Sequence, residues 1–280
     1  MEIPKFDAVE KTRFHDVTWV AEIPSTNTAL LERARQGALE GEVIIADLQT
    51  AGRGRRGRTW TAPAGTSLMM SILLRPPATA LSPNDASLAT SALALAARKA
   101  VADLTGVNLE IKWPNDLVVG APFDQRVEAD IGYRKIAGIL TETLIQDASI
   151  DALVIGMGIN TSWGVVPAEL QSIATSLDVL AGSSIDRNAL ALKILENLES
   201  EYTSLLRPNG KQQLLREVKK HSGTIGKQVR VQLGTEPNIQ QIEGRAVDLD
   251  ECGQLVLETD DDEVQVVAAG DVEHLRLDAR

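Results

Sequence analysis

The chain has 280 residues and a formal net charge of −11 at pH 7, with 44% hydrophobic and 24% charged residues. This is the composition of a globular protein that is long enough for one large domain and a smaller one. The acidic balance argues against general binding of polyanions. A single cysteine, Cys252, excludes an intrachain disulfide and fits a reducing compartment. No apolar run of about 18 residues could span a bilayer, and no signal-peptide pattern is present, so we expect a cytoplasmic protein with no membrane partner.

The first two thirds of the chain alternate between strand and helix patterns. Continuous apolar runs predict buried strands, and Ala/Leu-rich runs at helical spacing predict helices. The expected strands are 43–47, 67–74, 107–112 and 152–159, and the expected helices are 81–105, 186–206 and 210–220. Residues 113–116 read as a turn, and 117–119 and 135–145 as the arms of a hairpin joined by the polar stretch 120–134.

After Ser222 the pattern changes to short β-rich runs separated by Gly, Pro and Asp. The expected strands are 227–233, 241–249, 255–259 and 264–268. This spacing predicts a small β-barrel over residues 223–280, attached to a mixed α/β domain over residues 1–222.

The segment from Gly52 to Arg58 holds four arginines and three glycines in seven residues. Guanidinium groups resist burial and glycines add backbone freedom, so we expect a mobile loop that closes over an anion. Its glycines match G-x-G-x-x-G, but residues 58–65 make a poor helix, which argues against a dinucleotide site. One basic loop on an acidic chain is weak evidence for nucleic-acid binding. A small phosphorylated ligand is favoured, with a solvated loop that has no task as the alternative.

Four further segments accompany this loop in order along the chain: Ser25-Thr26-Asn27, Lys112-Trp113-Pro114-Asn115-Asp116, Lys135-Ile136-Ala137-Gly138, and Gly156-Met157-Gly158-Ile159-Asn160. Together they resemble the biotin protein ligases over nearly the whole chain. The resemblance implies an α+β fold, with a mixed-sheet catalytic domain of the biotin/lipoate ligase type and a C-terminal SH3-like β-barrel. It also implies a two-step reaction: ATP and biotin give biotinyl-5′-AMP with Mg²⁺, and biotin then passes to a lysine of a biotin carboxyl carrier protein domain of an acyl-CoA carboxylase.

The same resemblance assigns roles to individual residues. Those expected to bind biotin are Ser25, Thr26, Asn27, Gln49, Arg53, Gly54, Arg55, Lys135 and Gly138. Those expected to bind the nucleotide are Arg55, Arg56, Trp60, Trp113, Asn115, Lys135 and Asn160. The expected catalytic residues are Lys135, Arg55 and Arg53, with Asp116 as a ligand of Mg²⁺.

These roles make chemical sense. Adenylation brings the biotin carboxylate onto the α-phosphorus of ATP, so two anions must meet, and cations are needed between them. Each has a structural alternative. Ser25 or Asn27 could cap a helix over 28–36, and Asn115 and Asp116 could serve only a turn. Trp60 and Trp113 could pack in the core instead of stacking on adenine.

Two departures from the family pattern matter. Only 24 residues precede Ser25, too few for a helix-turn-helix domain, so we expect a ligase that binds no DNA. Eighteen residues separate Asp116 from Lys135, and we expect this insertion to form a hairpin tip away from the site. A lipoate-type ligase and a biotin-responsive regulator remain as alternative functions.

Overall fold

The computed structural model describes residues 9, 11–120, 132–166, 168–234, 239–261, 263–268 and 270–274. The described residues form a seven-stranded sheet in the order β1-β2-β3-β7-β6-β5-β4 and a five-stranded sheet in the order β11-β10-β9-β8-β12. The strands of the large sheet are β1 (Asp16–Ile23), β2 (Glu42–Gln49), β3 (Ser67–Leu74), β4 (Glu110–Lys112), β5 (Asp116–Gly120), β6 (Tyr133–Gln146) and β7 (Ser149–Asn160). The helices are α1 (Thr26–Arg35), α2 (Ala86–Thr105), α3 (Leu177–Ala181), α4 (Arg187–Leu205) and α5 (Gly210–Lys220).

The large sheet is mixed. Strands β1 and β2 are parallel, whereas every other neighbouring pair in it is antiparallel. Strands β5 and β6 pair antiparallel, which confirms the predicted hairpin arms. Residues 121–131 of its predicted tip lie outside the described residues, so the direction of that tip stays a prediction.

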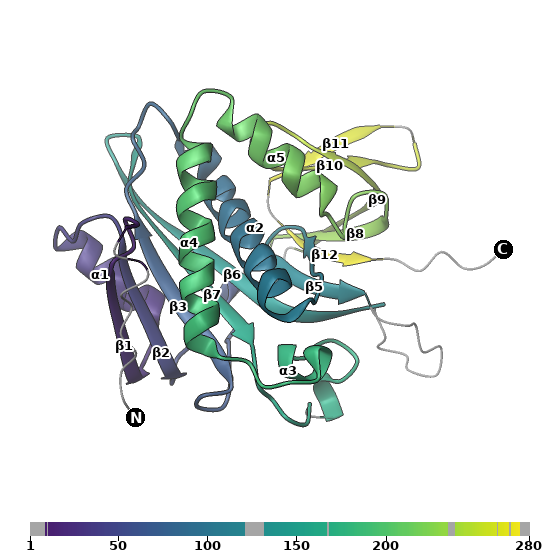
Figure 1. Ribbon diagram of the computed structural model, residues 1–280. Helices are drawn as coiled ribbons and strands as arrows, with labels where there is room; N and C mark the ends of the chain where they lie inside the picture. Colours follow the sequence, from purple (N-terminus) through teal and green to yellow (C-terminus); the bar gives the residue numbers. More distant parts are fainter. Residues whose placement is uncertain are drawn as a thin grey trace.

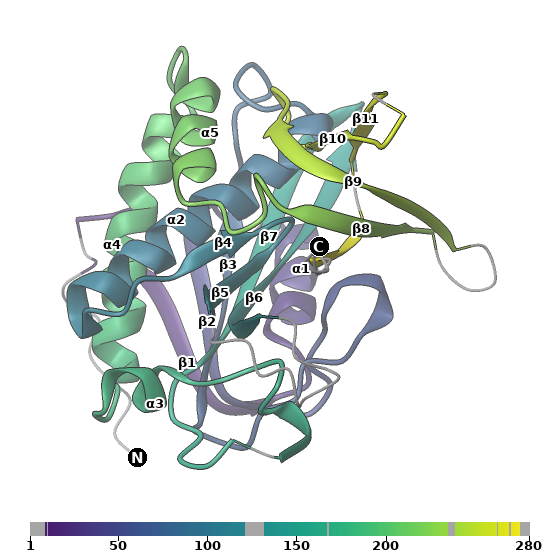
Figure 2. The same ribbon diagram turned by 90° about the vertical axis from the view of Figure 1, so that its right-hand side faces the viewer.

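Helices cover the large sheet on both faces, as Figures 1 and 2 show. Side chains alternate along a strand, so Val43 and Ile45 of β2 join the core cluster that contains α2 and α4, while Ile44 joins the cluster beneath α1. The larger core therefore lies between the sheet and the α2–α4 pair. In the described part of the chain, no helix has the length and apolar character needed to cross a membrane.

The helix ends follow the capping signals in the sequence. Ser82 and Asp85 form a capping box in a single 3-10 turn, after which α2 runs from Ala86 and ends at Gly106 in the left-handed conformation (φ 74°). Asp186 caps α4 by accepting from the backbone N–H groups of Asn188 and Ala189. The helices expected at 81–105, 186–206 and 210–220 are thus confirmed.

The smaller sheet is wholly antiparallel and consists of β8 (Gln228–Leu233), β9 (Gln240–Leu249), β10 (Leu255–Glu258), β11 (Val264–Val267) and β12 (Asp271–His274). The mixed sheet and the separate C-terminal antiparallel sheet confirm the expected α+β class. Among the α-helices and strands of the described residues, β1, α3 and β12 were not predicted. Each is short or half polar, so its apolar pattern is weak. Strands β1 and β12 are completed by β2 and β8, their partners from elsewhere in the chain.

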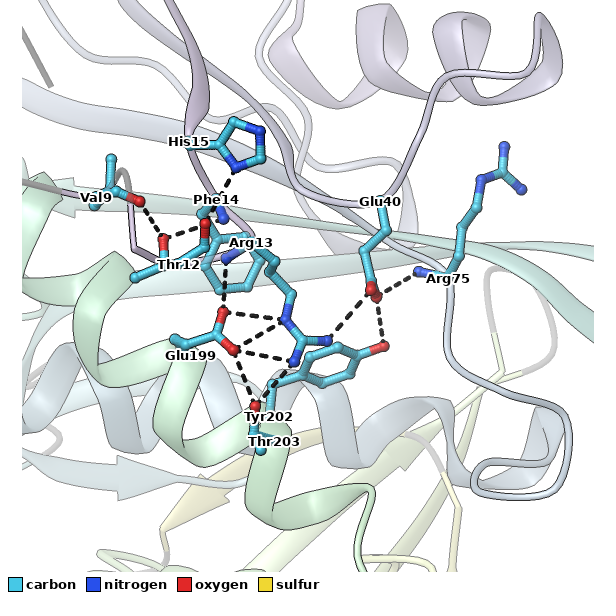
Figure 3. A network of polar contacts seen from close by, with 10 residues as sticks. All are labelled: Val9, Thr12, Arg13, Phe14, His15, Glu40, Arg75, Glu199, Tyr202 and Thr203. Atoms are coloured by element: carbon cyan, nitrogen blue, oxygen red, sulfur yellow. Dashed lines mark hydrogen bonds and ion pairs between the residues drawn. The ribbon is translucent and has the colours of Figure 1, made fainter. Parts of the chain in front are cut away.

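A polar network joins the segment before β1 to the end of α4 (Figure 3). The Arg13 guanidinium donates to both carboxylate oxygens of Glu199, to Glu40 at 3.2 Å and to Thr203 at 2.9 Å, and it lies 4.9 Å from the Tyr202 ring centre. The proximity of Arg13 holds the pKa of the Glu199 carboxyl below its usual range, although burial alone would raise it. This network fixes the first strand of the sheet against the helical layer.

Candidate functional site

A cavity of about 470 Å³ opens between the large sheet, the segment Gly52–Arg58 (the arginine loop) and strand β12 of the smaller sheet. Its size is that of a small-molecule site. The residues around it that the sequence predicted are Ser25, Thr26, Asn27, Gln49, Arg53, Gly54, Arg55, Trp60, Asn115, Asp116, Lys135 and Gly138. The fold thus brings segments from far apart in the chain to one place.

Hydroxyl and amide groups gather at one end of the cavity. Gln49 Oε1 accepts from the Thr26 backbone N–H at 2.8 Å and from the Thr26 hydroxyl at 3.1 Å. The Ser71 hydroxyl lies 2.6 Å from Thr26 Oγ1 and 2.5 Å from Asn27 Oδ1. Ser25 Oγ accepts from the Thr28 backbone N–H at 3.4 Å and so caps α1, while Ser25 also lines the cavity. Capping and a place at the site are therefore compatible for Ser25.

Glycines form the sheet surface beneath this end. Gly138 of β6 pairs with Gly158 of β7, and Gly156 lies two residues before Gly158 on the same face. A Cβ atom at Gly156 would overlap Asn27 Oδ1, and one at Gly158 would overlap the Trp60 ring. Only glycine lets these two side chains lie directly on the strands.

Cationic groups and the carboxylates of Asp116 and Asp271 gather at the other end. Lys135 Nζ lies 2.6 Å from Asp116 Oδ1 and 5.6 Å from the centre of the Trp60 ring. Arg55 donates to Asn115 Oδ1 at 3.0 Å, and Asn115 donates to the Ile139 carbonyl at 2.7 Å. Burial lowers the pKa of the Arg55 guanidinium, and Asp271 and Asp116 oppose that shift. An arginine keeps its charge even so, and burial strengthens its attraction for an anion.

The arginine loop is folded onto the protein itself. Arg53 pairs with Glu142 of β6 at 2.8 Å, and Arg58 pairs with Asp271 of β12 at 2.5 Å. Backbone bonds from Gly54 N–H to the Arg58 carbonyl, at 2.7 Å, and from Trp60 N–H to the Gly52 carbonyl, at 3.0 Å, close the loop. It contains one 3-10 turn and leads into β3, not into an α-helix. This agrees with the expectation that its glycines are not a dinucleotide fingerprint.

Three predicted nucleotide-binding residues lie outside the cavity lining. Trp113 is 7% exposed, and its indole N–H donates to the Gly253 carbonyl at 3.0 Å. Arg56 donates to the Gln232 carbonyl at 3.0 Å on the smaller sheet. Asn160 is buried and donates to the Thr175 carbonyl at 3.1 Å. These three side chains pack or bond within the protein, and their expected role in nucleotide binding stays a prediction.

Other residues of the site were not assigned from sequence. Lys112, the first residue of the Lys112–Asp116 motif, is 6% exposed and donates to the Val272 carbonyl at 2.6 Å; burial lowers the pKa of its ammonium group. Glu142 and Ser71 contact the predicted residues, and Asp271 pairs with the arginine loop. The motif pointed to Lys112, whereas nothing local in the sequence distinguishes the other three from ordinary surface or strand residues.

The residues around Asp116 bear on the expected magnesium ion. The described residues contain no cluster of three or more His, Cys, Asp or Glu side chains that could hold a metal. Asp116 is the carboxylate that pairs with Lys135, Asp271 and Glu273 also line the cavity, and the Asn115 oxygen already accepts from Arg55. The Asp116 carboxylate fits a Mg²⁺ ion that takes its remaining ligands from phosphate and water.

Two protein-family models match this chain. Residues 19–160 match the biotin/lipoate A/B protein ligase family, and residues 224–275 match the biotin protein ligase C-terminal domain. A biotin–(acetyl-CoA-carboxylase) ligase of Mycobacterium tuberculosis is 36% identical over 265 residues, which cover 92% of this chain and 88% of the relative. The bifunctional ligase/repressor BirA of Bacillus subtilis is 31% identical over 270 residues, covering 93% and 73%.

A solved structure has a similar fold. The biotin protein ligase from Aquifex aeolicus in complex with biotin and ATP matches with a TM-score of 0.73 at 25% identity, covering 94% of this chain and 100% of that chain. Family, relatives and fold therefore agree with the motifs and the cavity. The chain belongs to the biotin/lipoate A/B protein ligase family and is an enzyme of the biotin protein ligase kind.

Proposed function

We propose that this protein activates biotin with ATP and transfers it to a lysine of a biotin carboxyl carrier protein domain. In the first step a biotin carboxylate oxygen attacks the α-phosphorus of ATP, and pyrophosphate leaves. In the second step the carrier lysine amine attacks the acyl carbon of biotinyl-5′-AMP, a proton is lost from the amine, and AMP leaves.

This proposal rests on one observation: the two ends of a single cavity are lined by chemically different groups. Thr26, Asn27 and Gln49 supply hydroxyl and amide groups suited to a neutral ureido ring. Arg55 and Lys135 supply the positive charge that a carboxylate and a phosphate need in order to meet. A lipoyl chain has no ureido group to use the first end, so biotin is the better substrate.

Within this proposal, Arg53, Arg55 and Lys135 neutralise the reacting anions, and Trp60 packs on the bound ligand. The arginine loop covers the cavity and keeps water from the acyl-adenylate until the acceptor arrives. Asp116 would hold Mg²⁺ carried by the triphosphate, and the ion would supply further positive charge at the phosphates.

We also propose residues 1–222 as the catalytic domain and residues 223–280 as the C-terminal domain. Helix α5 ends at Lys220 and β8 begins at Gln228, which supports a boundary between them. The contacts of β12 with the arginine loop and with Lys112 support a part for the C-terminal domain in the site.

The test is incubation of the purified chain with radiolabelled biotin, ATP, Mg²⁺ and a carrier domain, followed by counting of label on the carrier. We expect label on the carrier lysine that depends on ATP, is absent from a carrier with that lysine replaced by arginine, and is not matched by labelled lipoate. Preferential labelling with lipoate, or no ATP-dependent label at all, would overturn the proposal.

A further inference from the structure

Glu142 of β6 contacts two residues of the cavity that belong to different segments, Asn27 and Arg53. We propose that Glu142 is a positioning residue that holds the Asn27 amide in one orientation, so that Asn27 accepts a hydrogen bond from a ligand N–H. This inference rests on the proposed function, because it assigns the ureido N–H of biotin as that donor.

The contacts of Asn27 within the protein leave its side chain one unused hydrogen-bonding position. Its side chain is buried, at 4% exposure, and Nδ2 donates to Glu142 Oε2 at 3.0 Å and to the Leu140 carbonyl at 3.2 Å. Both amide protons are therefore used within the protein. Oδ1 accepts from Ser71 at 2.5 Å. An amide oxygen has two lone pairs, so Asn27 can accept one more hydrogen bond and can donate none.

Glu142 contributes more to this orientation than Leu140 does. Its bond to Asn27 is charge-assisted and is the shorter of the two, and such bonds are roughly twice as strong as neutral ones. Turning the amide over would place Oδ1 against the Glu142 carboxylate and leave two acceptors facing each other in a buried position. The carboxylate therefore determines which end of the amide is left for a ligand.

The second contact links this end of the cavity to the arginine loop. Glu142 Oε1 lies 2.8 Å from an Arg53 nitrogen, while Oε2 holds Asn27. Arg53 neutralises the carboxylate, so Glu142 can sit beside an anionic ligand without strong repulsion. One side chain thus orients the ureido end and gives the loop its docking point on β6.

The test is isothermal titration of the full-length protein with biotin. Glu142→Ala removes the acceptor for both neighbours, and we expect Kd for biotin to rise by about tenfold, as for loss of a hydrogen bond to a charged group. Glu142→Gln must turn its NH₂ group toward either Asn27 or Arg53, both donors, so we expect a smaller rise of about threefold. Glu22→Gln, an exposed carboxylate on β1, is the matched control and should bind as the wild type does.

A double-mutant cycle separates positioning from a general loss of structure. Glu142 also docks Arg53, which Asn27→Ala leaves in place, so if Glu142 acts through Asn27 the double variant with Asn27→Ala and Glu142→Ala should bind biotin more tightly than the sum of the two single losses predicts. KM for ATP in pyrophosphate exchange should stay within about twofold of wild type in Glu142→Gln, because the change acts on ureido binding.

The outcomes distinguish a failure of the proposed function from a failure of the role proposed for Glu142. Wild-type protein that does not bind biotin overturns the proposed function. Wild-type protein that binds biotin while Glu142→Gln binds it equally well overturns the role of Glu142, and so do effects of Asn27→Ala and Glu142→Ala that simply add. Should Glu142→Ala fail to fold, the isosteric Glu142→Gln decides alone.

Discussion

Arg58 of the arginine loop lies 2.5 Å from the carboxylate of Asp271 on β12, and Arg56 lies 3.3 Å from the same carboxylate oxygen. Arg53 of the same loop pairs with Glu142 of β6, so both sheets contact the arginine loop. An aspartate of the C-terminal sheet thus holds two arginines of the loop.

We expect Asp271→Asn to loosen the arginine loop while leaving global stability almost unchanged, because the Arg58 side chain is 68% exposed and such ion pairs contribute at most about 1 kcal/mol. The measurement is hydrogen–deuterium exchange of residues 52–58, which should become faster. Glu243→Gln is the control, since it breaks an ion pair to Arg230 in the same sheet but away from the loop. Equal exchange of the loop in both variants would contradict this coupling.

Arg55→Gly should form the adenylate but release it. The substitution removes a half-buried guanidinium and its bond to Asn115, so the loop loses its anchor over the phosphate end. We would measure the fraction of labelled biotinyl-5′-AMP that stays on the protein after rapid gel filtration. Retention equal to that of wild type would show that Arg55 does not hold the intermediate.

Trp113→Phe should lower stability without weakening nucleotide binding. It leaves the buried Gly253 carbonyl without its indole donor, which costs about 1–3 kcal/mol of the free energy of unfolding. Chemical denaturation and KM for ATP together test this expectation. Trp60→Phe is the comparison, because Trp60 lines the cavity and its loss should weaken ligand binding. A large rise in KM for ATP with unchanged stability in Trp113→Phe would restore the stacking interpretation.

Arg13→Ala should destabilise the fold by about 1–3 kcal/mol, since it removes several charge-assisted bonds and leaves Glu199 without its cation. Arg35→Ala is a matched control, because that arginine is 56% exposed and pairs with Glu32 on the surface. Its effect should stay below about 1 kcal/mol. Urea denaturation measures both, and similar losses in the two variants would contradict the anchoring role of Arg13.

His274 makes stability depend on pH. Burial, together with Lys112 and Lys227, lowers its pKa from 6.5 to about 4. The unfolded chain therefore binds a proton below about pH 6.5 that the folded protein does not, so the His274 contribution to stability is lost as the pH falls toward 4. We expect His274→Gln to lose less stability than wild type between about pH 7 and about pH 5, by about 1–2 kcal/mol. Parallel pH profiles for the two proteins would contradict this assignment.

The buried strands, the long helices and the glycine turns were predictable because their signals are local. Helix α2, for example, carries its own capping box at Ser82 and Asp85 and its own terminal Gly106. Strand β12 was missed because its four residues pair with β8, about forty positions earlier, and little in their own sequence requires a strand. Trp113 looked like a ligand-stacking residue from its motif, but its environment depends on Gly253 and Thr224, which the motif does not contain.

The sequence by itself determined the chemistry available to this protein: an arginine-glycine loop, a lysine on a strand, and hydroxyl and amide groups before a helix. Each follows from residue type and near neighbours. Only the tertiary structure decided which of these groups share the cavity, that Glu142 and Asp271 complete their contacts, and that Arg56, Trp113 and Asn160 lie outside the cavity lining. The physical reason is that burial and pairing depend on residues that strand order and packing bring together. These residues lie too far apart in the sequence for a local pattern to predict their contacts.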